Sequence, residues 1–111
     1  MIPGIGGGMN LGKLMKQAQE MQKNMAKVQD ELKERVIAAS SGGGMVKVNF
    51  NGQQELMALK IDPEVVNKDD VTMLEDLITA AVNEGLNKSK EMAKEEMAKL
   101  TGGLGLPPGL F

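Results

Sequence analysis

Four lysines in the first third of the chain are spaced so that one helix would carry them on one side. Counted from Leu11 as heptad position a, Lys13 and Lys27 fall at position c. Lys16 and Lys23 fall at position f, on the same side and opposite a and d. Lysines three or four residues apart repel each other mildly on a helix. A solvated helix surface is one interpretation of the pattern, and a surface that binds phosphate groups, which would relieve the repulsion, is the other.

Three more lysines, Lys88, Lys90 and Lys94, lie toward the end of a second expected helix. Cations there complement the helix dipole, and Glu84 stands four residues before Lys88 as an ordinary helical ion pair. Helix stability explains this group better than the first. We therefore expect it to be a secondary part of any phosphate-binding surface.

The composition excludes most catalytic and metal chemistry. The chain has no Cys, His, Trp or Tyr, which removes disulfides, zinc sites and the usual nucleophile and base pairs. The glycines between Gly4 and Lys13 lack the Ser or Thr and the preceding strand of a phosphate-binding loop. The adjacent acids Asp69 and Asp70 do not face each other on a helix and are typical of a helix N-terminus. We predict no enzyme, no catalytic residue, no metal, no cofactor and no small-molecule substrate.

A helix from about residue 10 to 35 must position the first four lysines. Its apolar residues alternate three and four apart and form an apolar seam, Leu11, Leu14, Ala18, Met21, Met25, Val28 and Leu32. Such a helix is roughly 37 Å long, longer than a domain of this size is wide, so one protomer cannot easily cover it. The seam predicts packing for its methionines rather than copper ligation, and it predicts a homodimer.

Charge is distributed unevenly along a chain whose net charge is −2. Residues 1–29 hold four lysines and one acid, whereas residues 51–87 hold eight acids and two lysines. No charged and apolar leader is visible, and no stretch approaches the roughly 18 apolar residues of a membrane span. We expect a cytoplasmic protein with no membrane partner. With two Phe and ten Met, the core is thin for one protomer, which again favours burial between subunits.

Three strands and a second helix are expected after the first helix. Alternating apolar residues predict strands at residues 36–40, 45–50 and 56–61. Asp62-Pro63 is typical of a short helical turn, and a second long helix is expected from Asp69 or Asp70 to about Leu100. The order is α-β-β-β-α, an α+β fold with a small antiparallel sheet and two long helices. One domain over 1–111 is predicted, with flexible glycine-rich tails at about 1–8 and 102–111.

The pairing of the second and third strands is predicted from their apolar faces. Asn51-Gly52 suggests a two-residue hairpin turn, but a four-residue loop over 51–54 keeps one face apolar. That loop places Val48 opposite Met57 and Val46 opposite Leu59. The predicted core and dimer residues are Val46, Val48, Phe50, Met57, Leu59 and Ile61.

Several separated sequence blocks carry a resemblance to a known family. They are Leu14-Met15-Lys16-Gln17-Ala18-Gln19-Glu20-Met21-Gln22, Gly42-Gly43-Gly44-Met45-Val46-Lys47-Val48, Asn51-Gly52, Lys60-Ile61-Asp62-Pro63, Met73-Leu74-Glu75-Asp76-Leu77-Ile78, Ala80-Ala81-Val82-Asn83 and Pro107-Pro108-Gly109. In these blocks the chain resembles the YbaB/EbfC family of nucleoid-associated proteins, over nearly its whole length from Met9. The resemblance implies a bacterial homodimer shaped like tweezers, in which paired sheets join the subunits and the long helices bind DNA.

Two positions depart from the family pattern. The segment Arg35-Val36-Ile37-Ala38-Ala39-Ser40 lacks a glycine that relatives often carry, and Gly85 stands where alanine is more usual. A glycine inside a helix costs up to about 1 kcal/mol relative to alanine, so we expect a looser second helix and a flexible arm.

These features predict a nucleoid-associated protein that binds double-stranded DNA with broad specificity and alters its conformation. Lysine carries little base information, and the chain lacks the aromatic platforms that bind single strands. The alternative is a protein-interaction adaptor or chaperone-like clamp whose Met-rich seam grips an apolar partner helix. Steep loss of binding with salt would favour DNA, whereas binding that is largely insensitive to salt would favour the adaptor.

Overall fold

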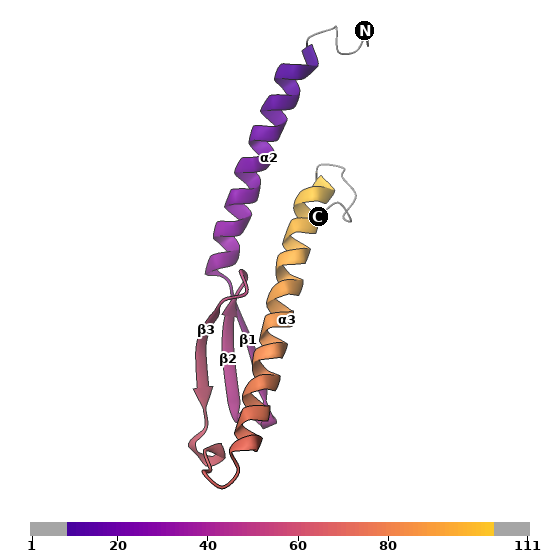
Figure 1. The fold of residues 1–111 in the computed structure, drawn as a ribbon. Coiled ribbons are helices and arrows are strands. Elements are labelled where there is room, and N and C mark those ends of the chain that lie inside the picture. Colours follow the sequence, from indigo (N-terminus) through magenta and orange to yellow (C-terminus); the bar gives the residue numbers. More distant parts are fainter. Residues whose placement is uncertain (1–8, 104–111) are drawn as a thin grey trace.

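The molecule is an elongated rod in which two long helices flank a three-stranded sheet (Figure 1). The computed structural model describes residues 9–103 and measures 76 × 22 × 17 Å, with a radius of gyration of 21.6 Å. A compact domain of this length would have a radius of gyration of about 13 Å. The elements in order are α2 (Met9–Glu34), β1 (Val36–Ser41), η1 (Gly42–Gly44), β2 (Val46–Asn51), β3 (Leu56–Ile61), η2 (Pro63–Val65) and α3 (Val71–Gly103). The predicted α-β-β-β-α order is confirmed.

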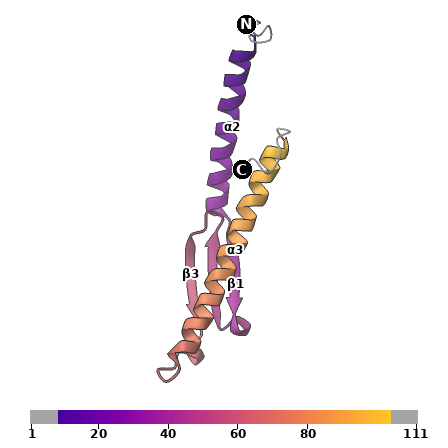
Figure 2. The same cartoon turned by 45° about the vertical axis from the view of Figure 1, so that its right-hand side comes forward.

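Helix α3 packs on one face of the sheet, over β1 and β2 (Figure 2). The strands are antiparallel in the order β1-β2-β3. The core contains Ala39, Val46, Val48 and Phe50 from the sheet and Ala81 from α3, with Ile61, Leu77, Ile78, Val82 and Leu86 partly buried around it. Strand β3 is exposed except at Ile61. The described part of one protomer therefore covers only part of this sheet face.

The predicted pairing of β2 and β3 is wrong by two residues. Val48 lies opposite Leu59, not Met57, and Val46 lies opposite Ile61. The turn has only three residues between the paired Asn51 and Glu55, and a register shift follows at Asn49 and Phe50. A shift of two residues preserves which side chains share a face, so the apolar face was predicted correctly although its partners were not.

Side-chain hydrogen bonds close the turn between β2 and β3, and the pattern of apolar residues does not predict them. Asn51 Oδ1 accepts hydrogen bonds from the backbone N–H groups of Gln53 (2.9 Å) and Glu55 (3.1 Å). Gln54 has a φ of 62°, the left-handed conformation that ends a three-residue hairpin loop. These contacts replace the predicted four-residue loop.

Gly85 lies at a close packing contact, which helix propensity alone did not predict. It is buried in α3 against side chains of β2. The absence of a side chain lets α3 approach the sheet closely, which couples the helix to the core.

Burial along the seam of α2 changes from one end of the helix to the other. Leu32, at the sheet end, is buried, and Met21, Met25 and Val28 are half-buried. The outer seam residues Leu11, Leu14 and Ala18 are exposed. In Figure 1, α2 extends past the end of α3, so among the residues that the structure describes, none covers the outer half of the seam.

Two acids at helix starts act as caps, as predicted. Asp62 Oδ1 accepts a hydrogen bond from the N–H of Glu64 (2.9 Å) before η2, with Pro63 in the first turn. Asp70 Oδ1 accepts one from the N–H of Met73 (3.2 Å) at the start of α3. Capping therefore accounts for Asp70.

Helix α3 includes Gly102 and Gly103, which were predicted to begin a tail. The remaining residues of the two predicted tails, 1–8 and 104–111, lie outside the part that the structure describes. Within residues 9–103, neither long helix has a segment apolar enough to cross a membrane.

Candidate nucleic-acid interface

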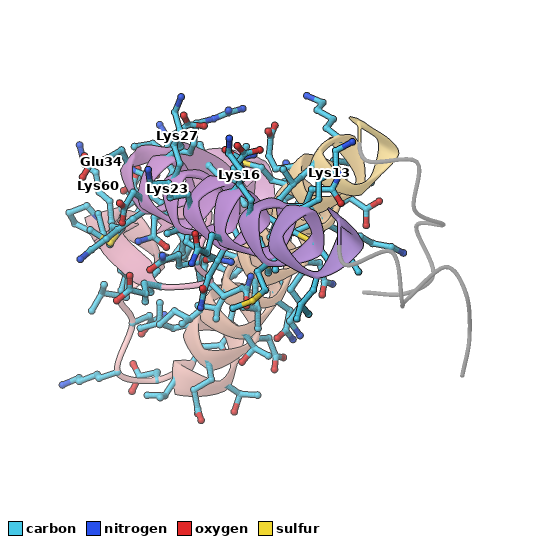
Figure 3. The ribbon with its side chains drawn as sticks, turned by 90° about the horizontal axis from the view of Figure 1, so that it is seen from above. Lys13, Lys16, Lys23, Lys27, Glu34 and Lys60 are labelled. Atoms are coloured by element: carbon cyan, nitrogen blue, oxygen red, sulfur yellow. The ribbon has the colours of Figure 1, made fainter. Side chains whose placement is uncertain are left out.

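Helix α2 carries the four lysines of the first predicted group along one side. At 3.6 residues per turn they fall within an arc of about 80° and span about 21 Å of the helix axis. We call Lys13, Lys16, Lys23 and Lys27 the lysine row; all four are exposed. Figure 3 shows them following one another along the same side of the helix. The ion pairs within residues 9–103 include none of the four, so no ion pair neutralises the row.

One acid interrupts the lysine row. Glu20 lies four residues after Lys16 and three before Lys23, and these side chains border a shallow open hollow together with Gln19 and Gln22. A lysine lies within one turn of Glu20 on both sides. The row with this acid keeps a net charge of +3.

The second group of lysines lies on α3 and is also exposed. Lys88 Nζ lies 3.4 Å from Glu84 Oε1, the ion pair that the four-residue spacing predicts. Lys90 and Lys94 have no ion pair within the described residues. Lys88 is thus partly neutralised, and the row on α2 is the stronger concentration of free positive charge.

Two further cations lie on the sheet face that α3 leaves open, and the sequence pattern did not single them out. Lys47 and Lys60 are direct partners across β2 and β3, and both are exposed. Like charges in this arrangement are destabilising. With Ser40 and Asn49 they border a shallow hollow of about 500 Å³. The correct strand register would have been needed to find this pair, because the predicted one places Lys47 opposite Ala58.

Contacts at the sheet end of α2 determine where this arm leaves the body of the molecule. The N–H of Gly52 donates a 2.7 Å hydrogen bond to the carbonyl oxygen of Leu32. A Cβ atom on Gly52 would lie 2.7 Å from that oxygen, so only glycine allows the approach. Gln53 Nε2 adds a 2.9 Å hydrogen bond to the carbonyl oxygen of Gln29. The lysine row therefore stands on a helix whose base is fixed to the β2–β3 turn.

The predicted core and dimer residues divide into two groups by burial. Val46, Val48 and Phe50 are buried within one protomer, and Ile61 is half-buried. Met57 and Leu59 on β3 are 61% and 43% exposed. The first group closes the protomer's own core, whereas Met57 and Leu59 form, with the exposed Leu56, an apolar surface on β3.

Comparisons with known proteins identify the same family as the sequence blocks. The model of the YbaB/EbfC DNA-binding family matches residues 7–104. A nucleoid-associated protein of Clostridium novyi (strain NT) is 55% identical over 110 residues, covering 99% of this chain and 96% of that protein. One of Acetivibrio thermocellus is 55% identical with the same coverage.

A solved structure supports the same relationship. The crystal structure of an uncharacterized protein from Helicobacter pylori matches with a TM-score of 0.72 at 30% sequence identity, over 78% of this chain and 91% of that one. The family match covers most of the chain, and the curated relatives cover almost all of it. The chain belongs to the YbaB/EbfC DNA-binding family.

Proposed function

We propose that this protein is a nucleoid-associated protein of the bacterial cytoplasm that binds duplex DNA through backbone phosphates. The observation that carries the proposal is the lysine row: four exposed lysines on one side of a projecting helix, without an ion pair in the described residues. Phosphate groups would neutralise these charges and relieve their mutual repulsion. Lys88, Lys90 and Lys94 on α3 form the second group.

The active form in this proposal is a homodimer shaped like tweezers. Two uncovered apolar surfaces support it: the exposed face of β3 and the outer part of the seam on α2. Exposed large apolar residues in such patches are typical of interaction surfaces. A second copy of the chain that covers β3 would bring two lysine rows to one duplex.

Contacts made by lysine alone explain the breadth of the proposed specificity. A lysine ammonium group neutralises a phosphate without reading the base edges, so unrelated duplexes are bound about equally well. Neutralising phosphates from two arms favours a changed DNA path, with consequences for gene expression, nucleoid organisation or DNA protection. The role we propose is binding, not catalysis.

A mobility-shift titration with duplex DNA at several salt concentrations tests this function. About four to six phosphate contacts from two arms give a slope of log K against log salt of roughly −4 to −5. Absence of duplex binding even at low salt would contradict the proposal.

One observation favours a second candidate function, a protein-interaction adaptor or chaperone-like clamp. Leu11, Leu14 and Met15 at the outer end of α2 are exposed, which suits an apolar partner helix. Binding of that kind depends on apolar burial and is largely insensitive to salt. The same salt titration, repeated with a protein partner, separates the two functions.

A further inference from the structure

Acidic residues continue the side of α2 that carries the lysine row. After Lys27, the next residues at the same two heptad positions are Asp30 at f and Glu34 at c. Both are exposed, and neither takes part in an ion pair within the described residues. In Figure 3, Glu34 lies past Lys23 and Lys27, at the end of the row away from Lys13. One side of the helix thus changes from positive to negative as it approaches the sheet.

Helix stability does not explain Glu34. Glu34 is the last residue of α2, where the helix dipole disfavours negative charge. Lys33, the basic residue of the last turn, is its immediate neighbour and points about 100° away around the axis. Arg35 is directed to α3, where its Nη1 lies 3.8 Å from Glu96 Oε1. The charge of Glu34 is therefore left uncompensated, whereas Asp30 has Lys27 and Lys33 three residues away on either side.

We propose that Asp30 and Glu34 repel the phosphate backbone and confine bound duplex to the outer part of α2, from Lys13 to Lys27. The inference rests on the proposed DNA-binding function. Along the axis, Asp30 lies about 4.5 Å and Glu34 about 10 Å beyond Lys27. These axial separations are about one screening length or less at 0.1 M salt, so the repulsion reaches the part of a duplex that Lys27 holds. In a tweezer-shaped dimer, the duplex lies near the tips of the arms and away from the sheets.

The test replaces both acids with their neutral analogues, Asp30→Asn with Glu34→Gln. Duplex affinity is measured against salt concentration and against duplex length. We expect affinity at low salt to rise roughly three- to tenfold and the slope of log K against log salt to become more negative by about 1. The variant should also need a longer duplex for full affinity, because a longer part of α2 contacts the DNA.

A matched control makes the same change in net charge at the opposite end of the rod. Glu75→Gln with Asp76→Asn alters two exposed acids near the start of α3, and we expect its affinity to stay within about twofold of the parent, because screening weakens distant charges. Thermal unfolding shows whether each double variant folds. A gain in helix stability alone would leave the slope of log K against log salt unchanged.

The outcomes separate the inference from the function on which it rests. If the two variants have equal affinities and slopes and the parent binds duplex, the proposed repulsion by Asp30 and Glu34 is refuted. The proposed DNA-binding function is not. A parent protein that binds no duplex would overturn the proposed function itself. A gain in affinity with a longer binding site only in the Asp30 and Glu34 variant supports the inference.

Discussion

The ring of Phe50 lies directly against the backbone of Gly85. A Cβ atom at Gly85 would be 2.5 Å from Cδ2 and 2.7 Å from Cε2 of that ring, and 3.0 Å from Cγ2 of Val48. Real Cβ atoms do not approach other atoms so closely, so a larger residue forces α3 away from β2. Phe50 and Val48 are both buried in the core, which leaves the ring little room to move.

We therefore expect Gly85→Ala to destabilise the protein. Overpacking a core costs about 1–3 kcal/mol, which exceeds the gain of up to about 1 kcal/mol in helix propensity. Urea denaturation followed by circular dichroism measures the change in the free energy of unfolding.

Gly12→Ala is the matched control, because nothing lies within 4 Å of the Cβ it would add. It should increase helicity without loss of stability. A Gly85→Ala variant as stable as Gly12→Ala would show that the contact with Phe50 is not limiting.

Ser89 on α3 joins the helix to the β2–β3 turn and should not tolerate alanine. Its Oγ donates a 2.6 Å hydrogen bond to the carbonyl oxygen of Asn51 and accepts one of 3.0 Å from the N–H of Gln54. Ser89→Ala leaves both backbone groups without these partners, which costs about 1–3 kcal/mol of stability. Denaturant unfolding measures the loss.

Thr79 provides the control, because its hydroxyl is exposed. It donates a 2.8 Å hydrogen bond to the carbonyl oxygen of Glu75, one helical turn earlier. Thr79→Ala should change stability by less than about 0.5 kcal/mol. Similar losses in the two variants would argue against a special role for Ser89.

Burial separates a residue of the protomer core from one at the proposed dimer surface. Val48 is 1% exposed and Leu59, its direct partner on β3, is 43% exposed. We expect Val48→Asp to unfold the protein, because it buries an unpaired charge. Leu59→Asp should leave the fold intact and yield a monomer. Light scattering after gel filtration should give about twice the 11.9 kDa chain mass for the parent at micromolar concentration.

The control for this prediction is Val36→Asp, at an exposed apolar residue of β1. It should remain a dimer, because β1 lies at the other edge of the sheet. A folded dimeric Leu59→Asp variant, or a parent that stays monomeric at micromolar concentration, would refute the β3 interface.

Local sequence signals predicted the helices and their caps because the responsible contacts span only a few residues. Asp62 and Asp70 bind N–H groups two and three residues ahead, a relationship visible in the sequence. The strand register was missed because it depends on Asn51 closing a three-residue turn and on an irregularity at Asn49 and Phe50. Apolar alternation cannot distinguish registers that differ by two residues.

The environment of Gly85 was misjudged for a different reason. Its partner Phe50 lies 35 residues earlier, so propensity alone suggested a loose helix. Asp30 and Glu34 were available in the sequence, since the heptad numbering that grouped the lysines also places both acids on the same side. Whether their charge is compensated depends on tertiary contacts such as the one between Arg35 and Glu96.

Changing all four lysines of the row to Gln tests most directly whether the row binds the phosphates of duplex DNA. Gln has similar helix propensity to Lys, so α2 is retained. A control with the same loss of charge changes Lys47, Lys60, Lys68 and Lys99, which lie outside α2. Circular dichroism checks that both variants fold. The affinity of each variant for two unrelated duplexes is then measured against salt concentration.

The lysine-row variant should lose at least about tenfold in affinity at about 0.1 M salt, with a much flatter salt slope, and equally for both duplexes. The control variant should keep most of the parent's slope of roughly −4 to −5. If the lysine-row variant had unchanged affinity and slope while the parent bound normally, the row would not be the phosphate-binding surface. Lys88, Lys90 and Lys94 would then be the next group to test.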